Sequence, residues 1–349
     1  TLTEPENFRV DSDAYFQHAS PMVILGNGTL NTVGRFYQYS SLNISNVDTL
    51  NVSGYFYQSN GLTLSSAATV NLLSGAYFTS RSNGTSDSGY KVKLFVENLN
   101  INSGAQINAS GTGYSGGTGD GGNGYGTGAG TGHWSYGGGG AGYGGAGGTG
   151  QSGGAGGGTY GASTANTPYL LGSGGGAGDN NANGGAGGGA VRLEVNGTLM
   201  VNGSILSNGA NGSNGSDGGG GGSGGSIWIT ARNFTGSAAI GAAGGTGNTQ
   251  GYDGGGGGGG RVSICWGNNT YSGSVTASAG TSTNGGNGGA GSVVYPTDCP
   301  YYPLEITSLS PVDNGTDIDL TPNLVATFSK TFDLLSTGGV DIYSNGGGL

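Results

Sequence analysis

A repeat of about twenty residues near the start of the chain limits the fold more than any other feature. Residues 30–38 (LNTVGRFYQ) return as residues 50–58 (LNVSGYFYQ), and residues 70–78 repeat the theme. Each unit alternates apolar and polar residues over short stretches, with Gly between them, which indicates β-strands. Twenty residues are too few for a self-sufficient module but suit one coil of a β-solenoid, whose coils stack about 4.8 Å apart. Residues 1–90 are therefore predicted to form solenoid coils.

A longer repeat follows in residues 91–300. Four apolar strands are expected to begin 36, 35 and 31 residues apart, at Ala190, Ser226, Arg261 and Ser292. A second short strand follows a Gly in each unit, after Gly104, Gly203, Gly236 and Gly273. We interpret this region as the same parallel solenoid with a glycine-rich excursion inserted into each coil. The predicted class is all-β.

Glycine accounts for 86 of the 349 residues and occurs in runs such as Gly218–Gly222 and Gly254–Gly260. Collagen is excluded, because there are only 8 prolines and the glycines do not follow a Gly-X-Y repeat. Composition alone would suit a flexible linker. However, each run recurs at one phase of the repeat and returns directly to a strand. The favoured hypothesis is therefore ordered, stacked segments that resemble polyglycine II, a three-residue-per-turn extended helix without side chains.

The segment 111–190 is an insertion rich in Gly and Tyr. It contains the aromatic residues Tyr114, Tyr125, Trp134, Tyr136, Tyr143 and Tyr160. These aromatics either cover a hydrophobic face of the array or face solvent on a disordered, self-associating loop. The sequence leaves both alternatives open.

The chain changes character after three prolines at 296, 300 and 303. Residues 304–349 look like the opening of a bacterial-type Ig-like domain, with SPVDNGTDI followed by PNLVATFS. A complete sandwich needs about seven strands and roughly 100 residues. Since only 46 residues remain, either the native chain continues past Leu349 or a neighbouring subunit supplies the missing strands.

The charge balance excludes several classes of partner. Nine Lys and Arg against nineteen Asp and Glu give a formal net charge of −10, without any basic run. Nucleic acids and anionic membranes are therefore not expected as partners. Apolar stretches of four to six residues are too short to cross a bilayer, so membrane insertion is not expected. The first residues do not form a signal peptide, so a secreted protein would already have lost it.

Catalytic groups are sparse. A polysaccharide-active β-helix needs paired acids, or an acid with basic residues, in a groove. The acids Asp48, Asp87, Glu97, Asp120, Asp179 and Glu194 are isolated in sequence, although residues one coil apart can meet. His18 and His133 are interpreted as packing or surface residues. The chain is predicted not to be an enzyme and to need no cofactor. A structural calcium ion is the remaining alternative, although Asp120, Asp179, Asp217 and Asp253 share no calcium-binding period.

Covalent features suggest secretion. Cys265 and Cys299 are the only cysteines, and one disulfide between them is favoured over two unpaired thiols. Asn-X-Ser/Thr occurs twelve times, somewhat above the chance expectation of roughly seven or eight. The candidate N-glycosylation sites are Asn27, Asn43, Asn51, Asn83, Asn108, Asn196, Asn202, Asn211, Asn214, Asn233, Asn268 and Asn314.

Aromatic residues in the first coils are expected to stack from coil to coil. Two adjacent ladders are predicted, one inside and one outside the solenoid, from Phe36, Tyr37, Phe56, Tyr57, Tyr77 and Phe78. The outer ladder is either ordinary cross-coil stacking or a platform for a carbohydrate or a partner subunit.

The combination of strand, glycine run and strand at residues 220–229 and 254–264 resembles a known signature. It is similar to the glycine-rich β-helix regions of very large secreted surface proteins, which sit beside Ig-like or EGF-like modules. That resemblance implies adhesion, or the building of extracellular fibres and flagellar hairs, and it supplies no catalytic residues. With only two cysteines, the chain departs from the EGF-containing members.

The resulting hypothesis is a secreted, N-glycosylated structural subunit of an extracellular filament or surface appendage. Its partners would be copies of itself, other extracellular glycoproteins or glycans, and an incomplete Ig-like sandwich would let neighbours add strands. The alternative is a surface adhesin that binds glycans or a partner cell. A polysaccharide-active β-helix enzyme is the third hypothesis.

Overall fold

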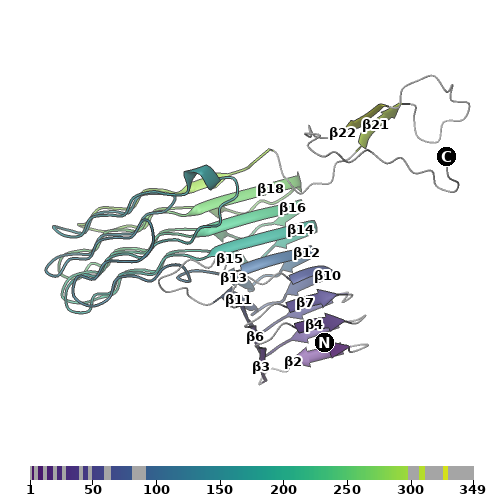
Figure 1. Ribbon diagram of the computed structural model, residues 1–349, viewed down its shortest axis with the longest axis horizontal. Helices are drawn as coiled ribbons and strands as arrows, with labels where there is room; N and C mark the ends of the chain where they lie inside the picture. Colours follow the sequence, from purple (N-terminus) through teal and green to yellow (C-terminus); the bar gives the residue numbers. More distant parts are fainter. Residues whose placement is uncertain are drawn as a thin grey trace, which may run out of the picture. The chain divides into compact units, whose positions relative to one another are not determined.

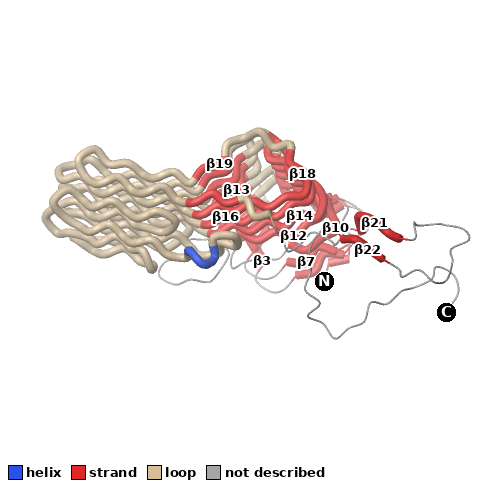
Figure 2. Tube along the Cα trace, turned by 90° about the horizontal axis from the view of Figure 1, so that it is seen from above, coloured by secondary structure: helices blue, strands red, loops and turns tan. Residues whose placement is uncertain are grey.

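A computed structural model describes the chain in two compact units, residues 1–300 and 301–349. The described residues are 2–3, 7–10, 14–18, 22–25, 29–38, 42–45, 49–58, 64–80, 92–297, 306–310 and 325–328. The first unit is a stack of parallel strands in three sheets, from which long glycine-rich segments project to one side (Figures 1 and 2). Within the described residues the helical structure is the 3-10 turn η1 (Ala162–Thr164), and there is no apolar helix long enough to cross a membrane. The predicted all-β class with parallel strands is confirmed.

The strands of the first unit fall into three sheets. The first sheet contains β1 (Leu2–Thr3), β4 (Met22–Leu25) and β7 (Leu42–Ser45). The second, called sheet B, contains β2 (Asn7–Val10), β5 (Thr29–Thr32), β8 (Thr49–Val52), β10 (Leu64–Leu72), β12 (Val92–Ile101), β14 (Ala190–Val201), β16 (Ser226–Gly236), β18 (Arg261–Asn269) and β20 (Ser292–Val294). The third, sheet C, contains β3 (Tyr15–His18), β6 (Arg35–Gln38), β9 (Tyr55–Gln58), β11 (Tyr77–Ser80), β13 (Gln106–Asn108), β15 (Ser204–Leu206), β17 (Ile240–Gly241) and β19 (Val275–Thr276).

The strand register follows the sequence repeats. Thr29 lies opposite Thr49, and Thr49 lies opposite Thr69, which is the twenty-residue period. In the longer repeat the four expected strand starts are aligned, since Ala190 pairs with Ser226, Ser226 with Arg261, and Arg261 with Ser292. Parallel pairing in constant register brings equivalent residues of successive coils directly above one another.

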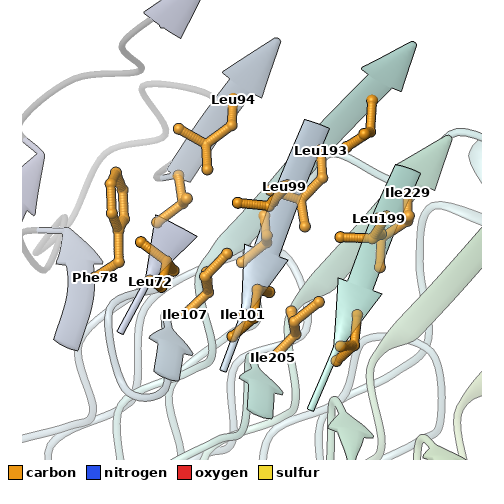
Figure 3. Packing of buried hydrophobic residues seen from close by; sticks show 14 of the residues in the cluster. Leu72, Phe78, Leu94, Leu99, Ile101, Ile107, Leu193, Leu199, Ile205 and Ile229 are labelled. Carbon is orange, nitrogen blue, oxygen red and sulfur yellow. The ribbon is translucent and has the colours of Figure 1, made fainter. Parts of the chain in front are cut away.

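The hydrophobic core runs along the inside of the solenoid between sheets B and C. Alternate residues of each strand point inward, as the pleat requires. One ladder runs through Phe36, Phe56, Phe78, Ile107 and Ile205, all at most 1% exposed. Across from it lie aliphatic residues of sheet B, including Leu94, Leu99, Leu193, Leu199 and Ile229 (Figure 3). The core changes from phenylalanine in the early coils to Ile and Leu in the later ones.

The glycine-rich excursions lie side by side as extended segments, hereafter the glycine bundle (residues 109–189, 207–225, 242–260 and 277–291). In the three later excursions, one segment leaves sheet C and a second segment returns to sheet B. Backbone hydrogen bonds join the outgoing segments to one another, as from Gly209 N–H to the Ala243 carbonyl, and the returning segments likewise, as from Gly221 to Gly255. The bundle is therefore held together mainly by its backbone.

Residues 254–260 occupy the interior of the bundle and show a three-residue period. The N–H groups of Gly254, Gly257 and Gly260 donate to residues 248, 245 and 242 of the outgoing segment. Those of Gly255 and Gly258 donate to residues 138 and 141, and those of Gly256 and Gly259 donate to residues 286 and 289. A Cβ on any of these seven residues would overlap a carbonyl oxygen of one of three further segments, at 219–225, 145–148 or 277–280. Six neighbours surround this segment, and only glycine fits at each position.

The insertion at 111–190 supplies additional rows of the bundle. Residues 137–142, 145–150 and 171–178 are extended segments that pack against the returning segments of later coils. For example, Ala141 donates to Gly221, Gly145 to Gly259, and Gly220 to Gly176. The insertion is thus ordered, and it covers a side of the glycine array that the later coils leave open. Its aromatics divide, because Tyr143 is fully buried whereas Trp134 is 72% exposed.

The second unit is described as an antiparallel pair, β21 (Ile306–Ser310) and β22 (Val325–Phe328). Antiparallel pairing separates it from the parallel solenoid. The remaining residues of the expected Ig-like module at 304–349 lie outside the described part of the chain, so that module stays a prediction.

Candidate functional sites

A cluster of charged and aromatic side chains lies on the outer face of sheet B. Lys93 and Phe95 of β12 lie beside Arg192 and Glu194 of β14, because Lys93 pairs with Arg192 and Phe95 with Glu194. The Arg192 guanidinium stacks over Trp228 at 4.2 Å and over Phe95 at 5.1 Å, and it forms an ion pair with Glu194. The cluster combines one acid, two bases and two aromatic rings.

Burial dominates the electrostatics of this cluster. It raises the pKa of Glu194, although Arg192 and Lys93 oppose the shift. It lowers the pKa of Lys93, and the positive charge of Arg192 adds to this effect. Glu194 looks isolated in the sequence, since its partner Lys93 is 101 residues away. Only the pairing of β12 with β14 across the whole insertion reveals the cluster. Of the other expected acids, Asp48 and Asp87 lie outside the described residues.

The predicted aromatic ladders are present, with one difference. The inner ladder is phenylalanine, and Phe56 stacks 4.8 Å from Phe36 and 4.5 Å from Phe78. On the outer face the tyrosines form two stacks, Tyr37 with Tyr57 at 5.3 Å and Tyr55 with Tyr77 at 5.6 Å. Because these rings largely cover each other's faces, the patch presents mainly ring edges and hydroxyl groups. This geometry favours cross-coil stacking over a flat platform for sugars. Burial, followed by the neighbouring tyrosines, raises the pKa of Tyr55.

The far end of the glycine bundle, called the distal tip, gathers the turns between segments. These turns are residues 118–121, 133–136, 150–153, 179–181, 214–217, 249–253 and 282–285. Trp134 is the most exposed large hydrophobic residue in the described chain. Behind it His133 lies 4.8 Å from Tyr136, whose ring meets that of Tyr252 edge-on at 4.8 Å. The other expected histidine, His18, lies on β3.

Four aspartates accept hydrogen bonds in these turns. Asp120 accepts from the N–H of Asn181, and Asp179 from the N–H of Asn180. Asp217 accepts from the Tyr252 N–H, and Asp253 accepts from both the backbone and the side chain of Asn284. The last two aspartates occupy equivalent positions one coil apart, which the sequence analysis overlooked. Within the described residues, His, Cys, Asp and Glu do not form a group of three that could hold a metal ion.

The candidate glycosylation sites differ in how the fold uses the side-chain amide. Asn51 donates its Nδ2 to Asn31 Oδ1 at 3.0 Å in a ladder that continues through Asn71 and Asn100. The Nδ2 groups of three further candidates also donate, Asn108 to Gln106, Asn233 to Thr198 and Asn268 to Asn233.

Two exposed candidates use Oδ1 instead. Asn211 accepts from the Thr246 N–H at 2.9 Å, and Asn214 accepts from the side chain of Asn248. Asn196 and Asn202 are exposed as well. The sites at Asn27, Asn83 and Asn314, and the side chain of Asn43, lie outside what the structure describes.

Cys265 lies on β18, is 2% exposed and takes part in a disulfide. Its Sγ also lies 3.4 Å from the Pro296 carbonyl oxygen. The expected partner Cys299 lies outside the described residues, so the pairing between these two cysteines stays a prediction.

Comparison of the chain with family models, curated proteins and solved structures finds no match.

Proposed function

We propose that this protein is a structural subunit of a secreted, glycosylated extracellular filament or surface appendage. The argument rests on the physical character of the fold. Outside the charged cluster on sheet B, the conspicuous surfaces are strand edges, turns and extended glycine segments. Such surfaces suit assembly better than turnover of a substrate.

The unfinished end of the solenoid carries the proposal. The last described strand of sheet B, β20, pairs only with Arg261–Ser263 of β18. Residues 264–269 of β18 therefore have no strand on that side within the described chain. At the same end Val275, Val293 and Tyr271 are only partly buried against the core. An open parallel edge beside exposed core residues invites strand addition from another chain.

Such a contact also explains filament growth. A second copy that docks a different surface onto this end makes a heterologous contact, and heterologous contacts propagate when they do not close into rings. The glycine bundle would add stiffness, since its interior segments are bonded on several sides. We propose that these segments have polyglycine II geometry, which the three-residue period of the hydrogen bonds supports.

Electron microscopy of the purified protein, before and after deglycosylation, tests the proposal. Regular filaments are the expected result. The double variant Val275→Lys/Val293→Lys should abolish them while the β-rich circular dichroism spectrum persists, because charges would then lie at the open end. Thr149→Lys, on an exposed residue of the bundle, is the matched control and should leave the filaments intact. Monodisperse rods of the unmodified chain would remove the filament hypothesis.

An adhesin is the second candidate, favoured by the exposed aromatic residues of the distal tip. Cell or glycan binding by single, unassembled chains would be its signature. The polysaccharide-active enzyme stays third. Glu194 is the acid on which it would depend, so turnover that Glu194→Gln abolishes would revive it.

A further inference from the structure

The distal tip presents a tryptophan in a fixed position. Trp134 is 72% exposed although it belongs to an ordered turn. The preceding residue, His133, donates its N–H to the Ala177 carbonyl, and the N–H of Ser135 donates to His133 Nδ1. Gly121 packs directly beneath the Trp134 backbone and has a φ of +72°, so a side chain there would collide with the turn. The protein thus exposes a large apolar ring without the freedom to bury it.

An exposed, immobilised tryptophan is the kind of group that anchors a protein interface. Trp, Tyr and Arg dominate binding hot spots, and a rigid aromatic loses little conformational entropy when it binds. Tyr252 is 40% exposed and, together with Tyr136, extends the aromatic surface beside this turn. The surface is therefore larger than one side chain.

The charge of the bundle selects the partner. Its segments (109–189, 207–225, 242–260 and 277–291) contain four Asp and no Glu, Lys or Arg, which gives a formal charge of −4. All four carboxylates lie in the distal turns. Aromatic faces attract cations through their quadrupole, and nearby carboxylates add a Coulomb term. Neutral ligands gain nothing from the second effect, and anionic ligands are repelled.

We propose that the distal tip is a docking surface for a lysine- or arginine-bearing segment of a partner protein. Trp134 stacks against an ammonium or guanidinium group, and the field of Asp120 and Asp179 steers the segment toward it. This surface lies at the opposite end of the excursions from the strands, so it is separate from the open solenoid edge. The tip would let an assembled filament attach to other proteins.

Titration with a peptide of six Lys-Gly repeats tests the inference, with calorimetry as the readout. The matched probes are a Glu-Gly peptide of equal length and the neutral oligosaccharide cellohexaose. We expect binding of the Lys-Gly peptide alone, at least tenfold weaker for Trp134→Ala, and weaker at higher salt because exposed charges are screened. Tyr169→Ala removes a 41% exposed aromatic residue outside the tip and should leave the affinity unchanged.

Three results would overturn the inference. The first is that the Lys-Gly peptide binds no better than the Glu-Gly peptide. The second is equal affinity of the wild-type protein and Trp134→Ala for the Lys-Gly peptide. The third is cellohexaose binding that depends on Trp134, which would assign the tip to a neutral glycan. Filament formation is scored separately by microscopy, so failure here and failure of the assembly hypothesis are distinguishable.

Discussion

The solenoid core and the glycine bundle solve the same packing problem with opposite materials. In the core, side chains such as Leu99 and Ile229 fill the space between two sheets and remove apolar area from water. In the bundle, Gly254–Gly260 have no side chains at all, and neighbouring backbones approach until carbonyl oxygens occupy the positions of the missing Cβ atoms. The first region is sensitive to lost volume, and the second is sensitive to added volume.

Loss of volume in the core should have the largest effect. Phe56 is 1% exposed and stacks between Phe36 and Phe78. Phe56→Ala should lower the free energy of unfolding by about 3–5 kcal/mol, because it removes the transfer energy of the ring and leaves a cavity. Phe56→Leu keeps most of the volume and should cost less than about 1.5 kcal/mol. Equal losses for both variants in denaturant titrations would show that stacking of aromatic rings, not volume, holds this ladder.

Added volume in the bundle should come next. Gly257 donates to Gly245, and a Cβ on it would overlap the Gly222 carbonyl oxygen. Gly257→Ala should therefore cost about 3 kcal/mol, the upper end for overpacked sites. Gly158→Ala is the matched control, because a Cβ there meets nothing within 4 Å. It should be neutral or slightly stabilising. If both alanines were tolerated equally in thermal unfolding, the close-packed array would be wrong.

Tyr143 joins the two regions and gives a pH-dependent effect. Its hydroxyl group lies 2.7 Å from Ser226 Oγ at the start of β16, and its ring packs 4.6 Å from Tyr160. Burial raises the pKa of Tyr143 to about 12. An unfolded tyrosine has a pKa of about 10. The neutral phenol therefore stabilises the fold fully below pH 10, and this contribution is lost as the pH rises from about 10 to 12.

The loss over that range should be about 2–3 kcal/mol for the wild-type protein. Tyr143→Phe should show a smaller loss, although Tyr271, whose pKa burial also raises to about 12, still contributes to it. The measurement is the unfolding free energy between pH 9 and pH 12. Identical pH profiles for the two proteins would mean that Tyr143 is solvated.

Much of the solenoid could be predicted from the sequence, since β14, β16, β18 and β20 begin where the repeat places them. Equivalent residues in a parallel stack share a register, so similar sequences mark their own partners. The pairing of β12 with β14 was beyond reach, because 88 residues separate Ile101 from Ala190 and no repeat bridges them. The charged cluster on sheet B depends on that pairing and was missed for the same reason.

The insertion shows a second limit of sequence analysis. Its glycines carry no side-chain pattern that distinguishes a row beside 217–225 from a row beside 253–260, so the sequence left order and disorder open. Backbone hydrogen bonds decide the arrangement, as in the contact from Ala141 to Gly221. The tip could not be predicted either. Trp134 and Tyr252 are 118 residues apart and meet only because several excursions have equal length.

The smallest expected effect concerns the surface that both regions share with solvent. Asn211 accepts a hydrogen bond through Oδ1, an arrangement that an N-glycan on Nδ2 would preserve. Asn51 instead donates its Nδ2 within a ladder of asparagines on β5, β8, β10 and β12. A glycan at Asn51 would have to fit between coils about 4.8 Å apart. Expressed in a secreting eukaryotic host, the protein should therefore carry a glycan at Asn211 and none at Asn51.

Mass spectrometry of peptides released after enzymatic deglycosylation in ¹⁸O water measures this occupancy directly. Ser213→Ala destroys the sequon of Asn211 but keeps its side chain, so one glycan mass should disappear with a stability change within about 0.5 kcal/mol, as for other surface substitutions. Ser53→Ala destroys the sequon of Asn51 and should leave the mass of the glycans unchanged. A glycan found at Asn51 would mean that the asparagine ladder tolerates an interruption. The solenoid wall would then be as open to modification as the edge of the glycine bundle.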